Sequence, residues 1–318
     1  MGKRIFFVRV VCGTAILLVL LWQVDVAGVI EHLKNARLPW VFASALAIIV
    51  ATFLGATNVH LFVNRDGRLP FRHFLPIYWL AWAMSLVVPG QIGDIASISI
   101  MLRRRGLPWH ASLGRTLLDK AITFVLMLLL GLGGLLSILA PEDLRLYELL
   151  WLLVGLACLG AILYAVRHRI ARAGLPYLDR VIELVQRTVR ESGEVIRLHS
   201  LRVALNMVLT AIRIALIGGS YWCMFVALGS SPNSLLQVVA IVAASSLVAY
   251  VPISFNGLGT VELAGIVLFG ELGIAGTTVL SAYLALRFLV FALAWIPTAL
   301  WLLLGGKQAG KTLDQNQP

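Results

Sequence analysis

Apolar residues along this chain fall into runs that are long enough to cross a membrane. A helix of about 20 apolar residues spans the hydrocarbon core of a bilayer. Runs of that length occupy 6–24, 40–63, 114–139, 147–166, 203–228 and 278–304. We predict one membrane-spanning helix in each of these six segments, and therefore an all-α polytopic helix bundle.

Two further apolar regions, 74–104 and 235–270, are interrupted near their middles. The first contains VPGQIGD (88–94) and the second VPISFNGLGTVE (251–262). The helix breakers are Pro89, Gly90, Gly93, Pro252, Gly257 and Gly259. Each half is short for a straight crossing. We therefore predict two re-entrant helical hairpins, which enter from opposite sides of the membrane. The alternative is that both halves of each region cross fully.

The composition excludes a soluble protein, because 60% of the residues are hydrophobic, 13% are charged and the mean hydropathy is +0.91. We predict one integral membrane domain over 1–318. The basic residues behind the net charge of +11 gather in alternate loops. This follows the positive-inside rule and predicts that both termini are cytoplasmic. Membrane topology thus explains the positive net charge, so this charge does not indicate nucleic-acid binding, and we expect no nucleic-acid partner. The basic connector 167–202 has apolar residues at helical spacing, which predicts an amphipathic helix on the cytoplasmic face.

No pattern for a metal or cofactor is present. Cys12, Cys158 and Cys223 stand alone in apolar segments, and the six histidines lack metal-ligand spacing. A phosphate-binding GxxxxGK[ST] motif is also missing. We predict no metal site and no cofactor.

The two interrupted regions resemble each other. SLVVPGQIGD in the first is echoed by SLVAYVPISFNGLGTVE in the second, and each acid is followed 25 positions later by another charged residue. We predict two inverted halves, roughly 40–140 and 203–304. Paired broken helices in inverted repeats are typical of transporters with a site near the membrane midplane.

Six ionisable residues fall within the apolar segments: Asp94, Asp119, Lys120, Arg213, Glu262 and Arg287. An ionisable group at this depth costs at least about 2.5 kcal/mol, so such groups pair, face a cavity or carry function. Three are acids and three are bases, which indicates mutual compensation. We predict that all six line a polar path for a substrate. The alternatives are that Asp94 and Glu262 stabilise helix N-termini and that Lys120 and Arg287 are their ion-pair partners. For Arg213 the alternative is that its side chain snorkels toward the membrane surface.

At these residues the chain resembles the membrane region of lysylphosphatidylglycerol synthase, a family with many stand-alone, flippase-like proteins. The matching stretches are VPGQIGDIASISIMLRRRG, TLLDKAITF, VPISFNGLGTVELAG and YLALRF. In the bifunctional enzymes this region is associated with moving an aminoacylated lipid between leaflets. The resemblance implies a similar activity here, without the soluble domain that makes the lipid.

The chain departs from the family pattern in the first hairpin. Gln91 and Ser97 stand where the family commonly has arginine, and Asp94 stands where it has glutamate. Asp119 and Lys120 replace a Glu-Arg pair. The resemblance therefore does not imply a phosphate clamp in this hairpin, and it predicts a different lipid from that of the better-known members.

Taken together, these patterns predict a flippase-like protein that translocates a lipid or lipid-linked headgroup between leaflets, and not an enzyme. The expected partners are membrane lipids, either phospholipids or polyprenyl-linked headgroups. The resemblance implies a bacterial or archaeal plasma (inner) membrane. One alternative is a membrane-embedded transferase that acts on a phospholipid or isoprenoid phosphate. Another is a non-catalytic scaffold for enzymes of lipid or glycan synthesis.

Overall fold

The computed structural model describes most of the chain between residues 26 and 304. The described residues are 26–64, 69–87, 93–103, 105, 107–139, 193–195, 197–232, 234–250 and 254–304. All regular elements in this part are helices. The predicted spans 6–24 and 147–166, the breakers Pro89, Gly90 and Pro252, and most of the connector 167–202 lie outside the described residues.

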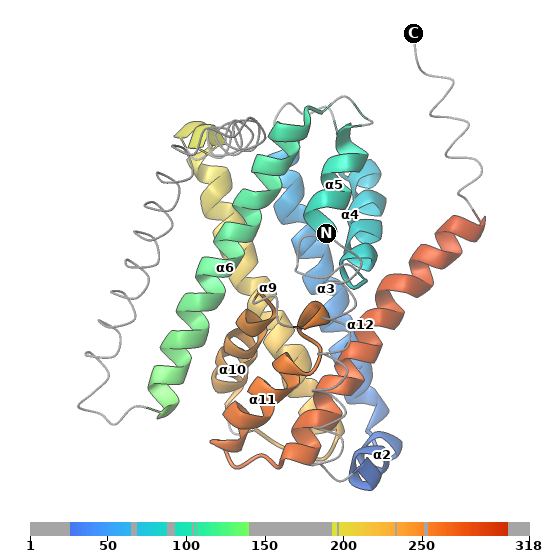
Figure 1. Ribbon diagram of the computed structural model, residues 1–318, viewed down its shortest axis with the longest axis vertical. Coiled ribbons are helices and arrows are strands. Elements are labelled where there is room, and N and C mark those ends of the chain that lie inside the picture. Colours follow the sequence, from blue (N-terminus) through green and yellow to red (C-terminus); the bar gives the residue numbers. More distant parts are fainter. Residues whose placement is uncertain are drawn as a thin grey trace, which may run out of the picture.

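Four long apolar helices form the frame of the bundle (Figure 1). They are α3 (Leu38–Val63), α6 (Trp109–Leu139), α9 (Ser200–Ala227) and α12 (Gly276–Leu304). Each is long and apolar enough to cross a membrane. These helices confirm four of the six predicted spans, with ends within a few residues of those expected. Apolar side chains such as Phe42 and Phe288 are exposed on their outer faces, as contact with lipid requires.

The two interrupted regions each form a pair of short helices. The first pair is α4 (Phe71–Ser85) and α5 (Gly93–Arg103). The second is α10 (Leu235–Leu247) and α11 (Thr260–Gly270), joined through the 3₁₀ turns η1 (Val248–Tyr250) and η2 (Phe255–Gly257). These α-helices have 11 to 15 residues, or roughly 16–22 Å, well short of the hydrocarbon core of about 30 Å.

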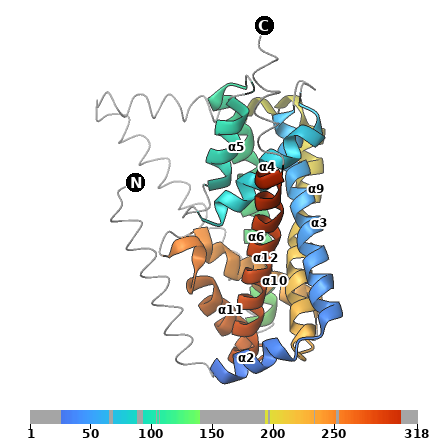
Figure 2. The ribbon, with the colours of Figure 1, turned by 90° about the vertical axis from the view of Figure 1, so that its right-hand side faces the viewer.

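The two hairpins lie at opposite ends of the bundle. Figures 1 and 2 show α4 and α5 in the upper half of the molecule and α10 and α11 in the lower half. Within each pair the helices pack against one another. This arrangement fits two hairpins that enter the membrane from opposite sides. Each half also has the same order of elements, a long helix, two short helices and a long helix; the boundaries of the predicted halves stay a prediction.

Close helix packing holds the second hairpin within the frame. The helix α3 lies along α9, and α6 lies along α10. On α6, a Cβ atom added at Gly134 would overlap Ala240, and one at Gly131 would lie 2.8 Å from the backbone nitrogen of Ala244. The missing side chains let α6 and α10 approach closely, as small residues do in membrane proteins.

A short helix, α2 (Val26–Lys34), lies between the predicted span 6–24 and α3, where the sequence predicted no helix. It packs against α12, and the backbone N–H of Arg37 after it donates to Ala227 O at the end of α9, 2.8 Å away. The prediction missed α2 because nine residues give too short a pattern to stand out beside membrane spans.

Candidate functional site

Glu262 and Arg287 form an ion pair between the second hairpin and α12. Glu262 lies in the first turn of α11 and is 0% exposed. Its Oε1 accepts from Arg287 Nε at 2.7 Å and lies 2.6 Å from Arg287 Nη2. Its Oε2 accepts from the backbone N–H of Gly259 at 2.7 Å. Both carboxylate oxygens are therefore occupied, which makes burial of this charge tolerable.

The glycines of the second breaker shape the backbone that meets this carboxylate. Asn256, Gly257 and Gly259 have φ angles of 48°, 69° and 79°. These left-handed conformations are easiest for glycine, because it has no Cβ. At Gly257 a Cβ would also overlap the side chain of Val261. The turn presents the Gly259 N–H to Glu262 and brings the carbonyl oxygens of Asn256 and Gly257 within 3.5 Å of the Arg287 guanidinium.

Asp94 and Lys120 form the corresponding pair in the first hairpin. Asp94 lies in the first turn of α5, which begins at Gly93. Its Oδ1 accepts from the backbone N–H of Ile95 at 2.8 Å, and its Oδ2 is ion-paired with Lys120 on α6. In both hairpins the acid thus serves a helix N-terminus and pairs with a cation on the following long helix. Each acid is therefore both a charge at a helix N-terminus and one half of an ion pair.

Asp119 belongs to a buried polar network that joins α3, α6 and α9. Its side chain is 1% exposed, and its Oδ1 accepts from Asn206 Nδ2 at 2.9 Å. The same Asn206 nitrogen lies 3.4 Å from Asn58 O, and Asn58 Nδ2 donates to Thr210 Oγ1 at 2.9 Å. Asn58, Asn206 and Thr210 were not among the predicted site residues, because that prediction rested on ionisable groups alone. Two asparagines within apolar runs were the available signal.

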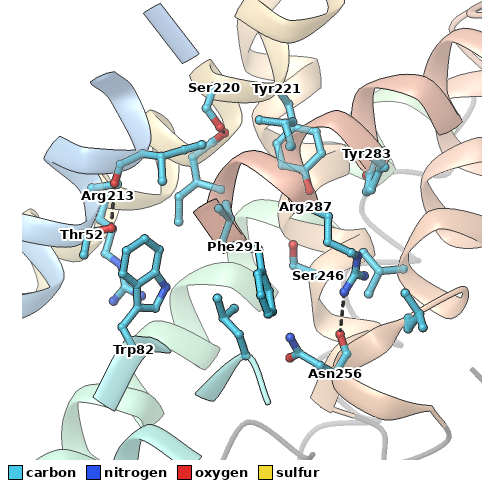
Figure 3. Close-up of a pocket in the computed structure, with 18 of the residues that line it drawn as sticks. Thr52, Trp82, Arg213, Ser220, Tyr221, Ser246, Asn256, Tyr283, Arg287 and Phe291 are labelled. Carbon is cyan, nitrogen blue, oxygen red and sulfur yellow. Dashed lines mark hydrogen bonds between the residues drawn. The ribbon is translucent and has the colours of Figure 1, made fainter. Parts of the chain in front are cut away.

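A cavity of about 490 Å³ lies between the hairpins and the long helices α3, α9 and α12. Its lining includes Tyr78 and Trp82 from α4 and Ser246 from α10. Figure 3 shows Arg213 and Trp82 on one side of the cavity and Arg287 and Asn256 on the other. Of the six predicted path residues, the lining contains Arg213, Glu262 and Arg287. The other three, Asp94, Asp119 and Lys120, are not among the described lining residues.

Both arginines of the cavity lie near the middle of their helices. Arg213 is about 20 Å from the start of α9, and Arg287 is about 17 Å from the start of α12 at 1.5 Å per residue. The remainder of the lining is largely aliphatic and aromatic, including Ile48, Ile217 and Phe291. The site therefore combines cationic groups at mid-depth with walls that suit apolar matter. Such a cavity suits an amphipathic ligand.

The described residues contain no group of three or more His, Cys, Asp or Glu side chains that could hold a metal ion. Comparison with known families assigns the chain: it belongs to the lysylphosphatidylglycerol synthase TM region family, whose model matches residues 6–300. No curated protein sequence matches it. Family membership supports a lipid-related role for an integral membrane protein.

Proposed function

We propose that this protein translocates a lipid headgroup between the two leaflets, with the headgroup passing through the cavity while the acyl or prenyl chains remain in the bilayer. The observation that carries the proposal is the cavity itself. It lies near the middle of the long helices, takes residues from both hairpins and combines three charged side chains with a largely aliphatic and aromatic remainder.

The broken helices support this activity for a physical reason. Non-helical backbone at membrane depth is tolerated where protein buries it or where it lines a cavity. In the second hairpin, the turn at 256–259 directs the carbonyl oxygens of Asn256 and Gly257 toward Arg287, at the cavity wall. Hairpins that enter from opposite sides give the two leaflets equivalent routes to one central site, which alternating access requires.

The membrane and orientation complete the proposal. The basic loops favour cytoplasmic termini, and the family resemblance favours a bacterial or archaeal plasma (inner) membrane. Transport would draw on an ion gradient, on the membrane potential or on the lipid's own imbalance. The rival functions, a transferase or a scaffold, remain outcomes of the test.

The test is leaflet exchange in liposomes that contain purified protein and a panel of asymmetrically labelled lipids. We expect wild type to exchange at least one lipid class. Glu262→Gln and Asp94→Asn should slow that exchange, because each leaves a cation without its carboxylate partner. The matched control is Gly133→Ala, since a Cβ at Gly133 meets nothing within 4 Å. Size exclusion and circular dichroism establish that each variant is folded.

The outcomes separate the candidate functions. No exchange by folded wild-type protein across the panel would remove the support for translocation. A covalently altered lipid in the same samples would identify a transferase instead. Wild-type rates in folded Asp94→Asn and Glu262→Gln would show that these two carboxylates are not needed for exchange. A folded protein that neither exchanges nor alters any lipid would fit a scaffold, whose partners would be enzymes of lipid or glycan synthesis.

A further inference from the structure

We propose that the transported headgroup is a lipid phosphate of net negative charge, and that Arg213 is the residue that binds it. The inference deepens the proposed function and rests on it for the route by which a lipid reaches the cavity. Its starting point is the charge on the cavity wall. The charged lining residues among those described are Arg213, Arg287 and Glu262, which leave one positive charge in excess.

The excess charge belongs to Arg213, because the other arginine is already paired. Arg287 is bound to Glu262 through Nε and Nη2. Arg213 makes no hydrogen bond or ion pair with any residue in the described part of the chain. Asp94 is ion-paired with Lys120. Asp119 accepts from Asn206 through Oδ1 and acts on Arg213 electrostatically, but it forms no hydrogen bond or ion pair with the guanidinium. A guanidinium near the membrane midplane is costly without a partner, so the cavity favours an anionic one.

Other polar groups on the wall suit a ligand rich in acceptors. The hydroxyls of Tyr78, Tyr221 and Ser246 line the cavity and form no hydrogen bond with a described residue. They can therefore donate to a ligand. Both oxygens of Glu262, the one carboxylate among the described lining residues, are occupied. A phosphate, with acceptor oxygens and a negative charge, fits this set, whereas an ammonium headgroup would find no free carboxylate.

Gly55 on α3 keeps the space in which Arg213 and Tyr78 lie. A Cβ at Gly55 would overlap the Tyr78 hydroxyl and would come within 3.3 Å of Arg213 Cζ. The guanidinium and the hydroxyl therefore lie next to each other on the cavity wall, where Gly55 leaves the backbone of α3 without a side chain. Gly55 acts as a positioning residue, since Gly55→Ala would move both groups while keeping the positive charge.

The experiment measures lipid binding to purified full-length protein in a neutral detergent, by the rise in melting temperature with added lipid. The probes are dioleoyl phosphatidylglycerol, dioleoyl phosphatidylcholine and, as a phosphate without acyl chains, glycerol phosphate. The variants are Arg213→Gln, Arg213→Lys and Gly55→Ala. The matched control is Arg202→Gln on the same helix, since Arg202 donates to Leu61 O and does not appear in the cavity lining.

We expect wild type to bind phosphatidylglycerol at least about tenfold more tightly than phosphatidylcholine, because choline cancels the charge of its phosphate and finds no free carboxylate among the described lining residues. Arg213→Gln should abolish that preference. Arg213→Lys should keep part of it, because lysine retains the charge but not the bidentate geometry. Gly55→Ala should weaken it, and Arg202→Gln should leave it unchanged. Glycerol phosphate should bind more weakly than the lipid.

Equal wild-type binding of the two lipids overturns the inference, and this comparison needs no variant. An unchanged preference in folded Arg213→Gln also overturns it, and so does glycerol phosphate binding as tightly as the lipid. The result is independent of transport. Phosphatidylglycerol binding through Arg213 without leaflet exchange would defeat the proposed function alone. Exchange without preference for anionic headgroups would defeat this inference alone.

Discussion

The ion pair between Glu262 and Arg287 allows a quantitative prediction of stability. In Glu262→Gln the guanidinium keeps its charge and loses its counter-ion, and in Arg287→Gln a fully buried carboxylate loses its cation. Breaking a buried pair by removing one partner costs about 3–5 kcal/mol. The Arg287 side chain is 31% exposed, so water can solvate it in part. We therefore expect Glu262→Gln to lower the free energy of unfolding by about 3 kcal/mol, and Arg287→Gln to lower it by more.

The double variant Glu262→Gln/Arg287→Gln distinguishes a charge effect from a loss of packing. It leaves no uncompensated charge, and a glutamine oxygen can still accept from the Gly259 N–H. We expect it to cost about 1–2 kcal/mol, less than either single variant, because residues in direct contact are not additive. The assay is reversible unfolding by sodium dodecyl sulfate in mixed micelles, followed by circular dichroism. A Glu262→Gln variant within about 0.5 kcal/mol of wild type, or a double variant equal to the sum of the single ones, would refute this reasoning.

Three further predictions concern packing and the buried network, and thermal unfolding in detergent checks each. Gly134→Ala should lower the free energy of unfolding by about 1–3 kcal/mol, because its Cβ would overlap α10. Gly133→Ala, its control, should be neutral or stabilising. Equal effects of the two variants would contradict the close approach of α6 and α10. Gly257→Ala should cost more than Gly273→Ala, because both have positive φ but a Cβ clashes at Gly257 alone; the reverse order would contradict the turn geometry. Asn206→Leu should cost about 2 kcal/mol or more, because a buried carboxylate loses its donor; an unchanged melting temperature would contradict the network.

The helical frame was predictable because membrane spans leave a strong and simple signal. A run of about 20 apolar residues has few alternatives to a helix, and α3, α6, α9 and α12 begin and end within a few residues of the predicted limits. The helix breaks were equally clear, since proline and glycine clusters cannot continue a helix without cost. The balance of acids and bases had offered the ion pair between Glu262 and Arg287 as an alternative to their role in a path.

The sequence could not predict which of the charged residues share the cavity. In a helix that is apolar on all sides, hydrophobic periodicity does not define the face that turns inward. Asp119 and Arg213 gave equal signals in the sequence, yet Asp119 is buried against Asn206 and Arg213 lines the cavity. The contribution of Gly55 was also hidden, because a close approach between helices depends on atoms far apart in the chain.

The most direct test of the central claim is to obstruct the cavity and measure leaflet exchange. Ser246 lines the cavity, whereas Phe288 is 80% exposed on the outer face of α12. In a background with the native cysteines replaced, Ser246→Cys and Phe288→Cys would each be labelled to completion with a bulky thiol reagent, with mass spectrometry to verify labelling. The account predicts that labelling stops exchange in Ser246→Cys and leaves it unchanged in Phe288→Cys. Undiminished exchange in fully labelled Ser246→Cys would contradict the claim that headgroups pass through this cavity.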